Sequence, residues 1–549
     1  MYTRISKSGG RSYLQLVEGH RDAEGKVRIK VVANLGRLDR LLPDKLDSLI
    51  NGLNRAVGRL ENTAHEISHD PARTYGTVFA LHELWKDLGF DRALNRALRS
   101  GKRSIDVEAL VRAMVFNRLC DATSKLGCLR WLETVAMPAM PEAVTHQQLL
   151  RAMDALMDNT EAVEEALARQ IRPLVDHDLT MVFYDLTTVR IHGDARLEDD
   201  IRAFGMNKET GGIARQFVLG VVQTAEGLPL MHTVHPGNVS ETKTLQGMVQ
   251  TVLQRFPIQR IILVADRGLL SLDNIHHLTD IADKDGRKLE FILAVPARRY
   301  GDLVETFRVF DFRTGEGLRE ASFEGHRLIV AHDAARAIEQ GEARRARINE
   351  LEAMGNAMVT KLDRQDEGKS AKGRRASDRG AYSRFVRAIA DAELARFIKA
   401  DFTADRFSWE VDEEAMARAA LFDGKLVLLT NVPEITPADA VARYKALADI
   451  ERGFRVLKSD IEIAPVHHRL PDRIRAHALI CFLALTLHRV MRMRLKAKGH
   501  TASPQVALDI LSRIQKHTAY AGSRSFNGIS KTTTEQLDLF ETLNLPKPA

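Results

Sequence analysis

Cysteine is scarce in this chain of 549 residues, which contains only Cys120, Cys128 and Cys481. No two of them form a CxxC pair, and so small an odd number excludes a disulfide framework and favours a reducing cytoplasm. Long apolar runs are also missing, since the longest nearly apolar run, residues 478–487, has ten residues. A bilayer-spanning helix needs about 20 apolar residues, and the N-terminus has no apolar stretch behind its charges. We therefore expect neither a signal peptide nor a membrane span.

The chain also lacks a strong excess of one charge. Its 80 Lys+Arg residues stand against 73 Asp+Glu residues, which gives a net charge of +7 and a pI near 9.2. This balance suits a polyanionic partner and excludes a disordered basic tail, but many proteins with such a charge bind no nucleic acid. Charge alone therefore does not assign a partner.

Three motifs that would suggest other functions are incomplete. Gly368–Ser370 ends like a P-loop, but residue 363 is Asp where the motif requires Gly, and no strand precedes it, so ATP use is not supported. No helix-turn-helix is distinct enough to assign. A further group of side chains lacks a recognisable zinc-ligand framework, so zinc is not expected: His467, His468, His477 and Cys481.

Length and a hydrophobic content of 44% indicate several cores, because a single core stops growing near about 250 to 300 residues. Residues 11–36 alternate polar and apolar positions around the turn-like DAEG, which predicts a hairpin in an N-terminal β unit over residues 1–73. Helical spacing over residues 74–178 predicts a domain of about five helices, a candidate for DNA binding.

Strand-rich runs dominate the next segment. MVFYDLTTV, RIILVADRG and FILAVPA, with a helix between the first two, predict an α/β core that begins over residues 179–297. Residues 298–421 change to short antiparallel strands and charged helices, which indicates an insertion. The core resumes over residues 422–495 with the strand KLVLLTNV and a helix over 438–458. Residues 496–549 are expected to form a C-terminal helical tail.

Three acidic residues stand one on each of three core elements: Asp185 within MVFYDLTTV, Asp266 at the end of IILVA, and Glu451 in the helix over 438–458. Phosphodiester chemistry needs charge neutralisation on the nucleophile and the leaving group, which two divalent ions held by convergent carboxylates can supply. Taken singly, Asp185 could cap a turn or pair with an arginine, Asp266 could cap a helix, and Glu451 could be a solvated surface residue. Together they predict a metal site.

The helix over 438–458 carries Tyr444, Glu451 and Lys458 at intervals of seven residues, which is about two helical turns, so all three belong to one face. Arg455 is four residues after Glu451 and joins that face. A carboxylate for metal and two cations for phosphate would then share one side of the helix. Such cations set affinity and register on DNA and do not read bases. The alternative is a surface ion pair of little energetic weight.

The segments FYDLTTV and VADRG, followed by the pattern Tyr, two residues, Arg, three residues, Glu, six residues, Lys, resemble a DDE transposase of the insertion-sequence-four group, closest to its insertion-sequence-1634-like branch. The resemblance extends over most of the chain. It implies an α/β catalytic core of RNase H-like fold, a mixed sheet with flanking helices, interrupted by a largely β insertion. Additional N-terminal β-hairpin and helical domains are expected. Leu447 stands where the pattern has Arg, and Arg443, Arg452 or Arg455 could serve instead.

The same resemblance implies the chemistry and the partners. Asp185, Asp266 and Glu451 would hold two Mg²⁺ ions, for which Mn²⁺ can substitute. The DNA-binding residues would be Tyr444, Lys458, Arg455, Arg452 and Arg267. The partners would be double-stranded DNA, as terminal inverted repeats and target, and a second copy of the chain in a homodimer on DNA, in a bacterial cytoplasm near the nucleoid.

Cut-and-paste transposition, in which cleavage at the transposon ends is followed by strand transfer into target DNA, is the function that these features predict. Two alternatives stay open. One is an RNase H-like nuclease that cuts DNA without joining it, and the other is a catalytically inactive DNA-binding protein derived from a transposase.

Overall fold

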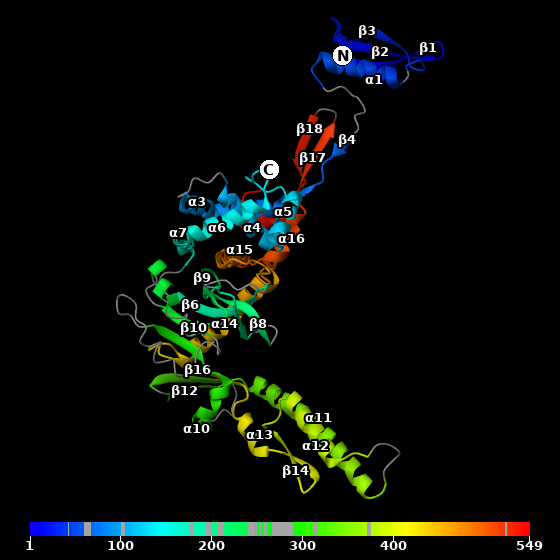
Figure 1. Cartoon of the computed structure of the whole chain (residues 1–549). Helices are drawn as coiled ribbons and strands as arrows, with labels where there is room; N and C mark the ends of the chain where they lie inside the picture. Colours follow the sequence, from blue (N-terminus) through cyan, green and yellow to red (C-terminus); the bar gives the residue numbers. More distant parts are fainter. Residues whose placement is uncertain are drawn as a thin grey trace. The chain divides into compact units, whose positions relative to one another are not determined.

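A computed structural model describes residues 1–41, 43–59, 67–99, 105–175, 180–193, 200–206, 212–239, 247–248, 250–252, 254–256, 261–265, 289–310, 317–323, 325–369, 375–521 and 524–548. Within these ranges, the side chains at 43, 44, 67, 180, 181, 185, 261, 265, 298, 447–454 and 524 are not described. The chain divides into two compact units (Figure 1). One comprises residues 1–72 and 516–529, and the other comprises residues 73–515 and 530–549.

The first unit contains two antiparallel arrangements. Its first strands and helix are β1 (Tyr2–Ser8), β2 (Arg11–Arg21), β3 (Val27–Arg37) and α1 (Pro43–Ala56). The predicted hairpin over 11–36 is confirmed as β2 and β3. It turns at Asp22, whose carboxylate accepts hydrogen bonds from the amides of Glu24 and Lys26 at 3.2 and 2.9 Å. Asp22 therefore satisfies the turn backbone with its own side chain.

The C-terminal region corrects one prediction. In place of a helical tail, residues 496–549 contain a hairpin of β17 (Gln515–Ala521) and β18 (Arg524–Ile529). In this hairpin, β17 also pairs with an early strand, β4 (Ile67–His69). Tyr520 and Phe526 favour strands, and Ala519 finds its partner at His69, far earlier in the chain. A local pattern cannot reveal so distant a partner. The flanking helices α16 (Pro504–Ser512) and α17 (Thr534–Thr542) belong to the second unit.

The second unit begins with helices, as predicted: α2 (Gly76–Asp87), α3 (Phe90–Ala97), α4 (Val107–Cys120), α5 (Lys125–Thr134), α6 (His146–Asp158), α7 (Thr160–Ile171) and the 3₁₀ turn η1 (Arg172–Leu174). Asp106, Ser124 and Thr145 precede α4, α5 and α6, and each side chain accepts a hydrogen bond from an amide of the first turn. These caps explain where three of the helices start.

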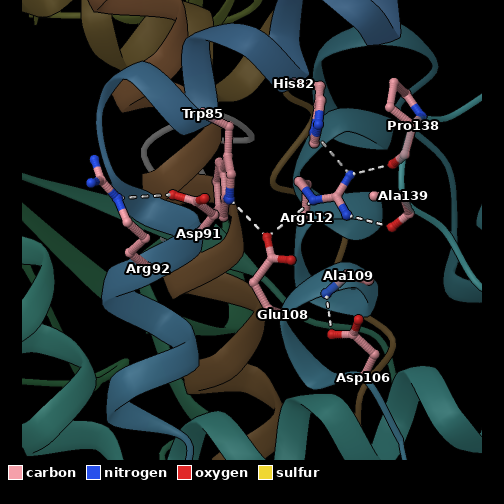
Figure 2. A network of polar contacts seen from close by, with 10 residues as sticks. All are labelled: His82, Trp85, Asp91, Arg92, Asp106, Glu108, Ala109, Arg112, Pro138 and Ala139. Carbon is pink, nitrogen blue, oxygen red and sulfur yellow. Dashed lines mark hydrogen bonds and ion pairs between the residues drawn. The ribbon is translucent and has the colours of Figure 1, made fainter.

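A buried ion pair fixes the interior of this helical region (Figure 2). Glu108 accepts hydrogen bonds from Arg112 at 3.0 Å and from the indole of Trp85 at 2.8 Å. The guanidinium of Arg112 also donates to the carbonyls of Pro138 and Ala139, both at 2.8 Å. Each charge thus has a partner, as a buried ion pair requires, and the loop before α6 is tied to α4.

A mixed sheet forms the centre of the second unit. Its strands are β6 (Thr180–Arg190), β7 (Ala203–Met206), β8 (Ile213–Thr224), β9 (Pro229–Pro236), β10 (Ile261–Ala265), β11 (Glu290–Ala294), β12 (Gly317–Phe323), β13 (His326–His332) and β16 (Lys425–Thr430). In the described part of the chain the order is β12-β13-β16-β11-β10-β6-β8-β7, with β9 on β8. β10 is parallel to both β6 and β11, and the other pairs are antiparallel. The predicted mixed α/β sheet is confirmed.

Two long helices follow β16: α14 (Pro437–Ser459) and α15 (Pro471–Ala497). α15 packs against α4, α6 and β9 (Figure 1). It is long and apolar enough to span a bilayer by length and composition, but 94% of its apolar window is buried inside the unit. A helix that is apolar on all sides and covered by protein is a core helix.

The segment between β11 and β16 corrects the expectation of a largely β insertion. After η3 (Ala297–Leu303) and α10 (Val304–Val309), β12 pairs with β13 and β13 pairs with β16, so both strands belong to the central sheet. The elements that follow are α11 (Ala334–Asp366), α12 (Asp378–Asp391), β14 (Ile398–Thr403), β15 (Arg406–Val411) and α13 (Glu413–Ala420). α11 alone has 33 residues, because its sequence is rich in Ala, Glu and Arg, which favour helix.

Candidate active site

α14 starts where the sequence provides a cap. The Thr436 hydroxyl accepts a hydrogen bond from the amide of Asp439 at 3.1 Å, and Pro437 occupies the first helical position, where proline is favoured. The helix predicted over 438–458 is thereby confirmed with ends at Pro437 and Ser459.

The N-terminal half of α14 covers one face of the central sheet. Val441 and the half-buried Tyr444 belong to a cluster with Phe183 of β6 and Val264 of β10. The strand residues that alternate with this set, such as Tyr184, belong to a different cluster on the opposite face of the sheet. Phe183 and Val264 are also register partners in the parallel pair of β6 and β10. Two adjacent strands and one helix therefore meet at a single place.

The three predicted catalytic residues are described only in part. Asp185 lies in β6, where its backbone pairs with Val221 of β8, but its side chain is not described. Glu451 lies in α14, and its side chain is not described either. Asp266 directly follows Ala265, the last residue of β10, and is outside the described residues.

The predicted DNA-binding residues are described unevenly. On α14, Arg455 is exposed, Lys458 is partly buried, and Tyr444 is partly buried against the sheet cluster. The side chain of Arg452 is not described, and Arg267 lies outside the described residues. An exposed guanidinium on the last turns of a helix can reach a phosphate without displacing any core contact.

A cavity of about 320 Å³ follows β6 beyond Asp185. Thr187 and Thr188 line it from β6, Gln216 lines it from β8, and Asn238 from the turn after β9 completes one side. The hydroxyl of Thr188 is buried without a hydrogen-bond partner among the described residues. The sequence segment DLTTV, with two threonines after the aspartate, was the available signal for these polar lining residues.

The end of α14 is held by groups that the motif analysis did not single out. Arg118 of α4 donates hydrogen bonds from Nη1 to the carbonyls of Ile461 and Glu462, at 3.4 and 3.2 Å. Nε2 of His488 on α15 lies 4.0 Å from a carboxylate oxygen of Asp460. Burial, with the neighbouring Arg489, lowers the pKa of His488 to about 4. The chain directly after the helix that carries Glu451 is therefore tied to α4 by hydrogen bonds.

Two family models match the chain. The Transposase DDE domain matches residues 176–487, which is more than half of the chain and includes the positions of all three predicted acids. The chain therefore belongs to the DDE transposases, enzymes that cleave DNA. Residues 2–65 match the N-terminal domain of IS1634 family transposases, so this is an IS1634-like DDE transposase, as its sequence motifs predicted. No curated protein matches the chain.

Membership of this family has direct consequences. The DDE domain implies an RNase H-like fold, and the mixed sheet with its helices agrees with that fold. DDE transposases bind DNA and generally use divalent metal ions. Among the described side chains, no three His, Cys, Asp or Glu residues gather as metal ligands would, but the three predicted ligands are not among those side chains.

Proposed function

We propose that Asp185, Asp266 and Glu451 are the catalytic carboxylates of this transposase. The supporting observation is the pairing of Phe183 with Val264 on the sheet face that α14 covers. Asp185 is two residues after Phe183, and Asp266 is two residues after Val264. Because alternate residues of a strand share a face, equal offsets from a paired position favour one common location for the two aspartates. Glu451 is seven residues after Tyr444 on the covering helix, which favours the same side.

The chemistry of these donors fits a hard divalent cation. Three carboxylates offer only oxygen ligands, which suit Mg²⁺, and Mn²⁺ can take the same ligands. Two such ions, when bound, would neutralise charge on the attacking and leaving oxygens of a phosphodiester. The protein supplies the convergence of the ligands and the rigidity of the two strands and helix that carry them.

The DNA contacts we assign are phosphate contacts. Tyr444, Arg452, Arg455 and Lys458 belong to α14, and Arg267 adjoins Asp266. Leu447 stands where the family pattern has Arg, and we assign that missing contact to Arg455, which is exposed one turn beyond Glu451. Such contacts place the strand in register for attack and are independent of base sequence.

We also propose a domain organisation for the chain. Residues 1–73 form the N-terminal β unit and residues 74–178 a helical DNA-binding domain. The RNase H-like core spans residues 179–297 and 422–495, and residues 496–549 form the C-terminal segment. Within 298–421, β12 and β13 are hydrogen-bonded into the central sheet, which favours residues 334–421 as the inserted part proper.

The reaction we propose is cut-and-paste transposition by a homodimer on paired ends. Water cleaves the phosphodiester at each terminal inverted repeat, and the freed 3′-hydroxyl then attacks target DNA at the same site. Both steps are phosphoryl transfers and can use one set of carboxylates in turn. A cytoplasmic site of action near the bacterial nucleoid follows from this substrate.

The test uses purified protein with Mg²⁺, a DNA carrying the gene's own flanking ends, and a target plasmid. Asp185→Asn, Asp266→Asn and Glu451→Gln should each lower cleavage and joining by about a thousandfold or more while end binding stays intact. The matched control is Glu434→Gln, the same kind of change at an exposed carboxylate just before α14. It should leave both reactions unchanged.

The products separate the alternatives. Sequenced joints between end and target establish transposition, whereas cleavage without joining would identify a nuclease. Binding with neither reaction would identify an inactive DNA-binding protein. Cleavage retained by any one of the three carboxamide variants would refute the assignment of that carboxylate.

A further inference from the structure

Two cations, Arg118 on α4 and Lys125 at the start of α5, are buried in the second unit with exposed fractions of only 5% and 6%. No carboxylate lies within ion-pairing distance of either one among the described residues, and Nε of Arg118 has no hydrogen-bond partner there. Burial and the nearby Arg118 lower the pKa of Lys125 to about 8. Burying two positive charges near each other is energetically costly unless an anion neutralises them.

Both residues line a cavity of about 480 Å³, and most of its polar lining is cationic or imidazole. Arg469 is a further cation, and Glu462, whose side chain is exposed, is the one carboxylate among the described residues of the lining. The charge of Arg473 is already matched by Asp154, at 2.8 and 2.9 Å. His468 and His477 are neutral at pH 7, because burial lowers the pKa of each, that of His468 to about 3.

Helix N-termini add positive potential to the same cavity. α5 begins at Lys125, α6 at His146 and α15 directly after Leu470, and all three of these residues line it. Leu470 provides no side-chain cap to α15, so the first amides of that helix receive no hydrogen bond from the N-cap side chain. Uncapped amides and the positive ends of helix dipoles favour an anion.

The cavity adjoins the elements that carry the proposed catalytic residues. Its wall from Glu462 to Leu470 begins three residues after α14 ends. Val466 pairs with Ile191 just beyond β6, and His467 stacks on His192 with ring centroids 5.0 Å apart. Ile191 is six residues beyond Asp185, or about 20 Å along an extended strand. That distance corresponds to about six base pairs of B-form DNA.

We propose that this cavity binds a backbone phosphate, with its sugar, of the DNA strand held by α14, at a position several nucleotides from the cleaved bond. The inference rests on the proposed function for the identity of the strand. The cavity volume exceeds that of one phosphate, so a nucleotide-sized part of the backbone fits. Lys125 would contact the phosphate, and Arg118 would both contribute charge and hold the wall at Ile461 and Glu462.

The experiment combines a protein variant with a DNA scan. Duplexes from the gene's own ends carry one neutral methylphosphonate in place of each of the ten phosphates on either side of the cut in turn. Affinity is measured by fluorescence anisotropy without divalent metal, so that catalysis does not enter. The test protein is Lys125→Gln, chosen because Arg118 also supports the chain after α14. The control is Arg130→Gln, which removes one exposed cation from the same helix but is not in the cavity lining.

For wild type, one methylphosphonate position should lower the affinity about tenfold relative to unmodified DNA. Lys125→Gln should bind unmodified DNA about tenfold more weakly than wild type does, and the methylphosphonate at that same position should cause no further loss. Arg130→Gln should keep the wild-type scan. His467→Ala changes an exposed residue of the cavity wall. It should reduce the loss of affinity that the methylphosphonate causes at that same position, and at no other position.

A scan of Lys125→Gln identical to that of wild type would overturn the proposal. A thermal shift measured with inorganic phosphate alone would then decide whether the cavity binds a free anion. Stabilisation of wild type but not of Lys125→Gln would identify a site for a free anion, and no stabilisation would exclude an anion site. Failure of the proposed function would instead show as no metal-dependent cleavage by wild type, in a separate assay that leaves this binding result readable.

Discussion

The two helices α14 and α15 follow one another in the chain and differ completely in how they are buried. Every residue of α15 from Ala476 to Met491 is buried. On the described part of α14, Ala440, Val441 and Leu457 are buried, whereas Lys445 and Arg455 are exposed. α15 thus joins the helices of residues 76–171 to the sheet, and α14 keeps one side open. Core packing and the proposed substrate contacts therefore lie on neighbouring helices, so each can be perturbed without the other.

The largest expected difference concerns packing. Leu483→Ala on α15 should lower the free energy of unfolding by about 2 to 5 kcal/mol, because it opens a cavity at a fully buried position. Lys445→Ala on α14 should change it by less than about 0.5 kcal/mol. Urea unfolding followed by tryptophan fluorescence in a Trp409→Phe background measures both, since Trp85 and Trp131 then report on the core around α15. Equal effects of the two changes would contradict the comparison.

The second prediction concerns pH and His488, which is buried in α15. Its folded pKa, about 4, lies below the ordinary value of 6.5, so the unfolded chain binds more protons between these values. Stability is therefore full above pH 6.5 and is lost as pH falls toward 4, by up to about 1.4 kcal/mol per pH unit from this residue.

The matched variant His488→Gln should flatten this dependence when unfolding free energies at pH 7 and pH 5 are compared. Other buried histidines, including His468, keep part of the slope. A slope identical to that of wild type would show that His488 is not held neutral in the folded protein.

The smallest effect is expected on the open side of α14. Arg455→Gln should leave the unfolding free energy within about 0.5 kcal/mol of wild type, and it should weaken end-DNA binding a few-fold. The slope of log affinity against log salt should decrease by about 1, because one phosphate contact is lost. Anisotropy titrations at several salt concentrations measure both, and an unaltered salt slope would remove Arg455 from the DNA contacts.

The sequence was most informative where a local pattern and a chemical requirement coincide. The strand around Asp185, the strand that ends before Asp266 and the helix around Glu451 were all predicted with nearly their observed bounds. Each has a strong apolar period, and α14 has a cap as well. The three acids on these elements led to the family that the comparisons confirm, while their assignment as ligands stays a prediction.

Distant partners were beyond a local pattern. Lys125 and His467 are separated by more than 300 residues, and only the packing of α5 beside the chain after α14 brings them into one cavity. Short antiparallel strands were predicted where β12 and β13 lie, but the pairing of β13 with β16 depends on a strand about 100 residues later. Trp409 packs on Phe385 and close to Gly355, so it fills the core of the inserted part through residues from three separate elements.

The pairing of β4 with β17 has a consequence for how the protein is made. His69 leaves the ribosome 450 residues before its partner Ala519. At about 5 to 20 residues per second, β4 waits roughly 20 to 90 s for the strand that completes its sheet. A product of premature termination would therefore hold a finished β1–β3 sheet beside an unpaired strand edge. The small sheet of β4, β17 and β18 can therefore form only after nearly all of the given sequence has been translated.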